Sequence, residues 1–149
     1  MAEMSVVFTL TTPGPDITFN AGSGDEYFLD PQMCSGLDGA PVRTTIDDAP
    51  QTPGGIVFPA VKGPRHVVLG GILLNRTGTA ASRNTMEDNL VAALDAIAGA
   101  DGTLAWTPSG GSARSLTVRL EIPVAFPAWS GFPFHKQFVF GLVAADPDW

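Results

Sequence analysis

The run of ten residues from Arg65 to Leu74, RHVVLGGILL, constrains the fold more than any other part of the sequence. It is almost continuously apolar and rich in β-branched side chains, and Gly63-Pro64 precedes it as a turn signal. This pattern predicts a strand buried on both faces, with Gly70-Gly71 forming a bulge or a close approach to another backbone. The run is too short for a membrane-spanning helix, which needs roughly 20 apolar residues. The rest of the chain must therefore cover both faces of this strand.

Further strand patterns occur along the chain, separated by glycine and proline. The 17 glycines and 13 prolines follow no three-residue period, which excludes collagen and argues against an all-helical bundle. The predicted strands are 5–11, 16–20, 27–29, 42–46, 56–59, 65–74, 103–107, 114–126 and 134–145. We expect 16–20 and 27–29 to form a hairpin, and antiparallel pairing to dominate the sheet.

The last two predicted strands differ in the cover they need. In 114–126 the alternating apolar side chains predict one core face, and Pro123 indicates an edge or a bulge. The alternating residues are Leu116, Val118, Leu120, Ile122 and Val124. In 134–145, Phe138 and Phe140 lie on one face while Val139 and Val143 lie on the other, so both faces need cover. Either a neighbouring copy of the chain or a helix packed on the sheet could supply it.

One helix is predicted, at 85–98, because its apolar residues recur at steps of three and four. Asn84 is expected to cap its first turn together with Glu87, and Gly99 suits its C-terminal end. The fold class is therefore mainly β (α+β): an antiparallel β-sandwich or split barrel with one flanking α-helix. A chain of 149 residues fits a single domain over 1–149.

Titratable residues are few and form no recognised catalytic or cofactor motif, so an enzyme is the least supported class and no cofactor or metal is expected. His66 and His135 are interpreted as strand-end residues, and Cys34 as an incidental thiol. Asp25, Glu26 and Asp30 could bind a divalent cation, but their spacing does not match a calcium loop and favours a solvated acidic loop.

The net charge of −7 argues against electrostatic binding of nucleic acid or of an anionic membrane. Only 15% of the residues are charged, against about 25% in a typical globular domain. A single cysteine and the lack of an export signal indicate a reducing compartment.

Candidate contacts between subunits come from the aromatic residues and from a long loop. Trp129, Phe132 and Trp149 either cap the ends of the barrel or contact other subunits, and the sequence favours neither reading. The loop 31–55, which includes Leu37, Val42 and Arg43, is long enough to predict a functional or interfacial role.

The order of short motifs resembles the N-terminal domain of the distal tail proteins of long-tailed bacteriophages. The matching motifs are Gly36-Leu37-Asp38, Val42-Arg43, Pro53-Gly54-Gly55, Gly63-Pro64-Arg65 before the apolar strand, Asp101-Gly102-Thr103-Leu104, the strand from Arg114 to Arg119, and Ala145-Asp146-Pro147. The resemblance covers nearly the whole chain.

The resemblance implies a tail-tube-like fold and a structural role in the virion, made in the cytoplasm of the host bacterium. Distal tail proteins assemble as a hexameric ring that joins the tail tube to the baseplate or tail tip, and genomic DNA passes through the ring. An acidic chain suits a lumen through which DNA slides without binding. Many members continue into a second, β-rich domain after the Asp-Pro, and here no C-terminal accessory domain is expected.

Two other functions remain open. A tail-tube or tail-completion protein of related fold would have the same sequence features. In a different class, a small ligand-binding β-barrel could use Trp106 and Trp129 as stacking surfaces.

Overall fold

The computed structural model describes residues 6–38, 42–43, 46–48, 55–57, 61–127 and 135–148. The elements in chain order are β1 (Phe8–Thr11), β2 (Ile17–Phe19), β3 (Glu26–Leu29), the 3₁₀ turn η2 (Pro31–Met33), β4 (Val42–Arg43), β5 (Ile46–Asp48), β6 (Gly55–Val57), β7 (Val61–Lys62), β8 (Arg65–Leu74), α1 (Ala80–Ala96), β9 (Gly102–Trp106), β10 (Arg114–Ala125) and β11 (His135–Ala144). The fold is mainly β with one helix among the described residues, as predicted.

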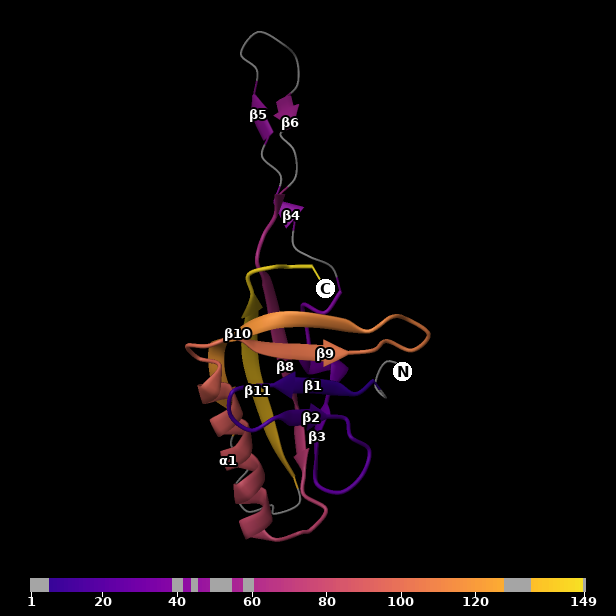
Figure 1. Ribbon diagram of the computed structural model, residues 1–149, viewed down its shortest axis with the longest axis vertical. Coiled ribbons are helices and arrows are strands. Elements are labelled where there is room, and N and C mark those ends of the chain that lie inside the picture. The colour runs from indigo at the N-terminus through magenta and orange to yellow at the C-terminus, as the bar shows by residue number, and fades with distance from the viewer. Residues whose placement is uncertain are drawn as a thin grey trace.

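Seven strands form a closed barrel in the order β1-β2-β3-β8-β11-β10-β9. β1 pairs with β9, so the sheet closes into a barrel, and the more detailed expectation of a sandwich or split barrel is not confirmed. In Figure 1, β1, β2 and β9 lie across the front while β8 and β11 pass behind them. All pairings are antiparallel except that of β2 with β3, which meet in parallel at Phe19 and Tyr27. The predicted hairpin of 16–20 with 27–29 is therefore wrong, and β2 instead forms its hairpin with β1.

Asn20 explains why the chain turns away after β2. It has a positive φ of 60°, and its side-chain amide donates to the Val6 carbonyl and accepts from the Leu29 amide at 3.0 and 2.9 Å. These bonds tie the start of β1 and the end of β3 to the end of β2. β3 therefore lies beside β2 and runs in the same direction as β2.

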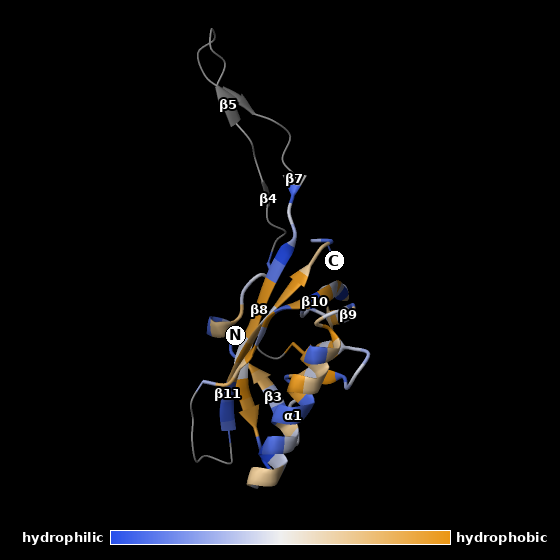
Figure 2. Ribbon diagram, turned by 90° about the vertical axis from the view of Figure 1, so that its left-hand side faces the viewer, coloured by the Kyte–Doolittle hydropathy of each residue, from blue (hydrophilic) through white to orange (hydrophobic). Residues whose placement is uncertain are grey.

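β8 has the predicted boundaries and lies in the centre of the back layer (Figures 1 and 2). All ten of its residues pair with β11, and residues 71–74 also pair with β3. Gly71 confirms the predicted close backbone approach, because a Cβ there would collide with the Phe28 carbonyl oxygen. In Figure 2, β8 and β11 are mainly hydrophobic along the barrel.

The core consists of aromatic side chains from the barrel and one face of α1. Phe19, Phe138 and Phe140 have ring centroids 6.0 to 6.1 Å apart and are almost fully buried. From α1 and the residue after it, the buried side chains are Met86, Leu90, Ala93, Leu94 and Ile97. The predicted apolar stripe of the helix is thus confirmed.

The helix starts five residues before the predicted position. Thr79 is its N-cap, since its hydroxyl accepts the Ser82 amide at 3.1 Å, and Asn84 lies inside the helix. Glu87 contacts Arg83 and Lys136 instead of completing a cap at Asn84. The C-cap is Ile97, so Gly99 follows the end of the helix rather than forming it.

β10 departs from strict alternation after Leu120. Its register against β11 shifts between Leu120 and Ile122 and again before Ala125, around Pro123. The bulge confirms one reading of Pro123, and it turns Ile122 outward, where its side chain is 53% exposed. The prediction that Ile122 lies in the core is therefore wrong.

β4–β7 and β5–β6 form two short two-stranded ladders, which together we call the arm. The arm lies beyond the end of the barrel where β8 begins (Figure 1). The predicted strand 42–46 is divided between β4 and β5. Of the long loop predicted at 31–55, residues 42–43, 46–48 and 55 belong to the arm.

Candidate functional site

The described residues bring together no group of three or more His, Cys, Asp and Glu side chains that could hold a metal ion. His66 pairs with Glu121 across the outside of the barrel, its Nδ1 lying 2.8 Å from the carboxylate. The Cys34 thiol is half-buried and lies 3.5 Å from the Gly70 carbonyl oxygen, and burial raises its pKa. A raised pKa disfavours the reactive thiolate.

The acidic residues after Gly24 have structural roles, although Asp25 is exposed to solvent. Asp25 accepts bonds from the Thr77 amide, the Thr77 hydroxyl and the Ser82 hydroxyl at 2.8 to 2.9 Å. The bond from the Thr77 amide is the main cause that lowers the pKa of Asp25. Glu26 is buried, and its carboxylate lies 2.7 Å from Arg76. The loop before β3 is thereby fastened to the segment that leads into α1.

Asp30 serves a third purpose, because its carboxylate accepts the Gln32 amide and caps η2. The prediction of a solvated acidic loop is therefore wrong for Glu26. Asp25 is exposed to solvent, as predicted, but its carboxylate is held by hydrogen bonds from the protein.

Charged side chains lie close together at the start of β8, where the chain passes from the arm into the barrel. Arg65 is 2% exposed, and burial lowers the pKa of its guanidinium while Asp148 opposes that shift. Asp148 also forms a 2.6 Å ion pair with Lys62 of β7. The segment near Asp148 is thus tied by charge to the base of the arm.

The outer face of β1, β2 and β9, together with Ser115 and Thr117 of β10, is formed by small side chains without charge. We call it the hydroxyl face. Cross-strand pairing places the following side chains on it: Thr9, Thr11, Thr18, Thr103, Ala105, Ser115 and Thr117. The fully buried core of a protein interface is depleted of charged residues, and the hydroxyl face shares that one property.

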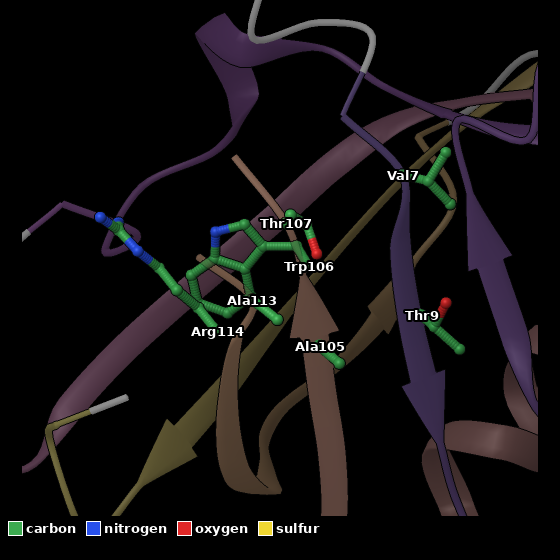
Figure 3. Close-up of a pocket in the computed structure, with 7 residues that line it drawn as sticks. All are labelled: Val7, Thr9, Ala105, Trp106, Thr107, Ala113 and Arg114. Atoms are coloured by element: carbon green, nitrogen blue, oxygen red, sulfur yellow. The ribbon is translucent and has the colours of Figure 1, made fainter. Parts of the chain in front are cut away.

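An open depression of about 370 Å³ lies at one end of the hydroxyl face (Figure 3). Its lining residues are Val7, Thr9, Ala105, Trp106, Thr107, Ala113 and Arg114. Trp106 is 7% exposed and stacks on Phe8 with centroids 5.5 Å apart. Its indole therefore belongs to the packed wall, and it presents little ring surface for the stacking role considered for it.

The opposite side of the barrel carries an aliphatic surface. Around the barrel, β11 is separated from β1 by β2, β3 and β8 in one direction and by β9 and β10 in the other. Val139 and Val143 of β11 are half-buried on the outside, and Ile122 lies over Gly141. Together with Val68 of β8 we call them the aliphatic face. As predicted, both faces of β11 are apolar.

The six predicted interface residues have different outcomes. Leu37 is half-buried and packs against the core. Val42 and Arg43 form β4 in the arm, where they pair with Lys62 and Val61. The remaining three, Trp129, Phe132 and Trp149, lie outside the described residues.

The sequence did not predict that Val7 and Ile122 are exposed. They are the most exposed large apolar residues of the described chain, at 45% and 53%. Pro123 was the available signal for Ile122, because a proline at a bulge changes which side chains face outward.

None of the described helices is long and apolar enough to cross a bilayer.

No protein-family model and no curated protein matches the sequence. Among solved structures, the crystal structure of SPP1 Dit matches 95% of this chain with a TM-score of 0.59 at 16% identity. Its title describes it as a paradigm of the hub adsorption apparatus in phages that infect Gram-positive bacteria. This chain spans about half of that protein, 51% of its length. The match is one of fold, and it extends over nearly all of the present chain.

Proposed function

We propose that the chain is a structural protein of a phage tail, of the distal tail type. In this role its tail-tube-like domain, residues 1–149, assembles as a hexameric ring that joins the tail tube to the baseplate or tail tip, and genomic DNA passes through the ring. The protein is made in the host cytoplasm and resides in the virion. The observation that carries the proposal is the fold shared with SPP1 Dit over 95% of the chain.

Two features of the surface support an assembly role independently of that likeness. The described strand residues of β1, β2 and β9 put no charged side chain on the hydroxyl face, and depletion of charged residues is typical of the buried centre of an interface. The arm consists of two-stranded ladders, and a two-stranded ladder alone is marginally stable in water. Packing against a neighbouring subunit would stabilise the arm.

Electron microscopy of the purified protein and of tails from virions tests the proposal. Ring particles with sixfold symmetry at the distal end of the tail are expected. A particle that stays monomeric at high micromolar concentration and is missing from tails would contradict it.

Deleting Ala49 to Gly54, which connects β5 to β6, tests the role of the arm. The deletion should abolish ring assembly and leave a folded monomer, because the barrel does not include these residues. Unchanged assembly would remove the arm from the proposed interface.

A tail-tube or tail-completion protein of related fold is the alternative within the same class. The number of copies per virion separates the two. A connector contributes one or two rings, whereas a tube protein contributes many.

A further inference from the structure

We propose that copies of this chain associate head to tail, with Ile122 of one copy inserted into the depression beside Val7 of the next. The inference rests on the proposed ring assembly and specifies the two surfaces that meet. The occupant of the depression is thus a second copy of the chain.

The two surfaces both expose an apolar side chain. Ile122 lies over Gly141 at the bulge of β10 and is 53% exposed. On the hydroxyl face, Val7 and Ala105 line an open depression of about 370 Å³, which has room for a branched aliphatic side chain (Figure 3). Burying both Val7 and Ile122 removes the two largest exposures of apolar side chains among the described residues.

The two surfaces are also complementary in charge. Arg114 lies at the rim of the depression, and Glu121 directly precedes Ile122. Glu121 is on the outside of the barrel, since its carboxylate reaches His66. Docking Ile122 would bring a carboxylate toward a guanidinium, and opposite charges at the margin of an interface favour one register.

The positions of the two surfaces determine the type of assembly. They are different patches, because Ile122 lies at the bulge of β10 over β11, whereas the depression is lined by residues of β1, β9 and the start of β10. Contact between unlike patches is heterologous, so each copy can bind one neighbour on either side. Such contacts form a closed ring when the rotation between copies closes, whereas a two-fold dimer would need like patches to meet.

Cross-linking with single-cysteine proteins tests this arrangement. In a C34S background, V7C and I122C are prepared separately, and each is treated with a short thiol-specific bifunctional reagent, alone and in an equimolar mixture. The mixture should give covalent dimers, and either protein alone should give almost none. The V7C/I122C double variant should give a ladder of products up to the full ring. N89C replaces V7C as the matched control, because Asn89 is exposed on α1, which contributes no residue to either face.

The outcomes separate the two proposals. Efficient linking of I122C to itself would overturn the head-to-tail contact in favour of a two-fold one. Rings seen by microscopy without linking of V7C to I122C would overturn this contact and leave the proposed function standing. A wild-type protein that stays monomeric would overturn both.

Two substitutions measure the contribution of the contact. I122D should weaken self-association at least about 30-fold in sedimentation equilibrium, the range of an interface hot spot. Its fold should persist, which circular dichroism would verify, because the side chain is half exposed in the monomer. R114E and E121R should each weaken association, and the double variant should recover it because the opposite charges are exchanged across the interface. A double variant as weak as the singles would contradict the proposed register.

Discussion

The hydroxyl of Tyr27 donates a 2.7 Å hydrogen bond to the carbonyl oxygen of Met86. This bond joins β3 of the barrel to the middle of α1, 59 residues later in the chain. The Tyr27 ring also makes edge contacts with Phe19 and Phe138 in the core. A polar group at the centre of the aromatic cluster thus helps to hold the helix against the barrel.

Ionisation of Tyr27 should destabilise the fold at alkaline pH. Burial raises its pKa from 10 to about 12, so the unfolded chain loses this proton at a lower pH than the folded chain. The stability that the protonated hydroxyl contributes is complete below pH 10 and is lost as the pH rises toward 12. The total loss is about 2 to 3 kcal/mol by linkage. Urea unfolding between pH 8 and pH 12 measures it.

The same group can be followed directly, because Tyr27 is the single tyrosine of the chain. Tyrosinate absorbance should titrate near pH 12 in the native protein and near pH 10 in urea. Y27F serves as the control, since it lacks the titration. Y27F should also cost about 1 kcal/mol at neutral pH through the lost bond to Met86. A native titration near pH 10 would contradict the burial of this hydroxyl.

Asp25 should make the fold sensitive to acid. Bonds from Thr77 and Ser82 favour its ionised form, and the pKa of its carboxyl is lowered below the ordinary value. Its contribution is therefore present above pH 4 and is lost as the pH falls through the lowered pKa. D25N should lose roughly 0.5 to 1 kcal/mol at pH 7, discounted for the exposure of this side chain, and less at pH 2. D88N, on the exposed face of α1, should change stability at neither pH by a comparable amount.

Gly71 should tolerate no side chain. A Cβ there would collide with the Phe28 carbonyl oxygen, which belongs to the backbone of the paired strand β3 and cannot move away alone. G71A should therefore cost about 3 kcal/mol or more, or prevent folding. G99A is the matched control, since a Cβ at Gly99 has no atom within 4 Å. Equal thermal midpoints for the two variants would show that β3 does not approach β8 as closely as described.

The strands that were predicted with nearly correct ends are those whose apolar pattern follows directly from burial in the core. β8 has the predicted ends, and β9, β10 and β11 lie within two residues of theirs, because continuous or alternating apolar residues report directly on core contact. The start of α1 was missed because residues 80–84 are polar or small and lie before the apolar stripe. Thr79 could have indicated it as a cap.

The surfaces proposed for assembly were predicted less well. Alternation placed Ile122 in the core, and one bulge reverses that placement, which depends on the pairing of β10 with β11 and not on local sequence. The depression beside Val7 combines residues from β1, β9 and β10, so no local pattern contains it. The apolar outer face of β11 was correctly predicted, because Val139 and Val143 belong to one strand.

Two ion pairs of similar length should differ in what they contribute to stability. The Glu26–Arg76 pair, at 2.7 Å, has a carboxylate that is 4% exposed, whereas both side chains of the Lys62–Asp148 pair, at 2.6 Å, are more than half exposed. R76M leaves the buried carboxylate with the hydrogen bond that it accepts from the Gly22 amide and should cost about 2 kcal/mol. K62M should cost at most about 0.5 kcal/mol, because solvent screens an exposed pair.

A double-mutant cycle distinguishes the cost of a stranded charge from the loss of packing by the arginine. Adding E26Q to R76M removes the charge, so the double variant should be more stable than R76M alone in urea unfolding at pH 7. Two results would show that burial of Glu26 does not determine the strength of this pair. One is an equal loss of unfolding free energy in R76M and K62M, and the other is a double variant whose loss equals the sum of the losses in E26Q and R76M.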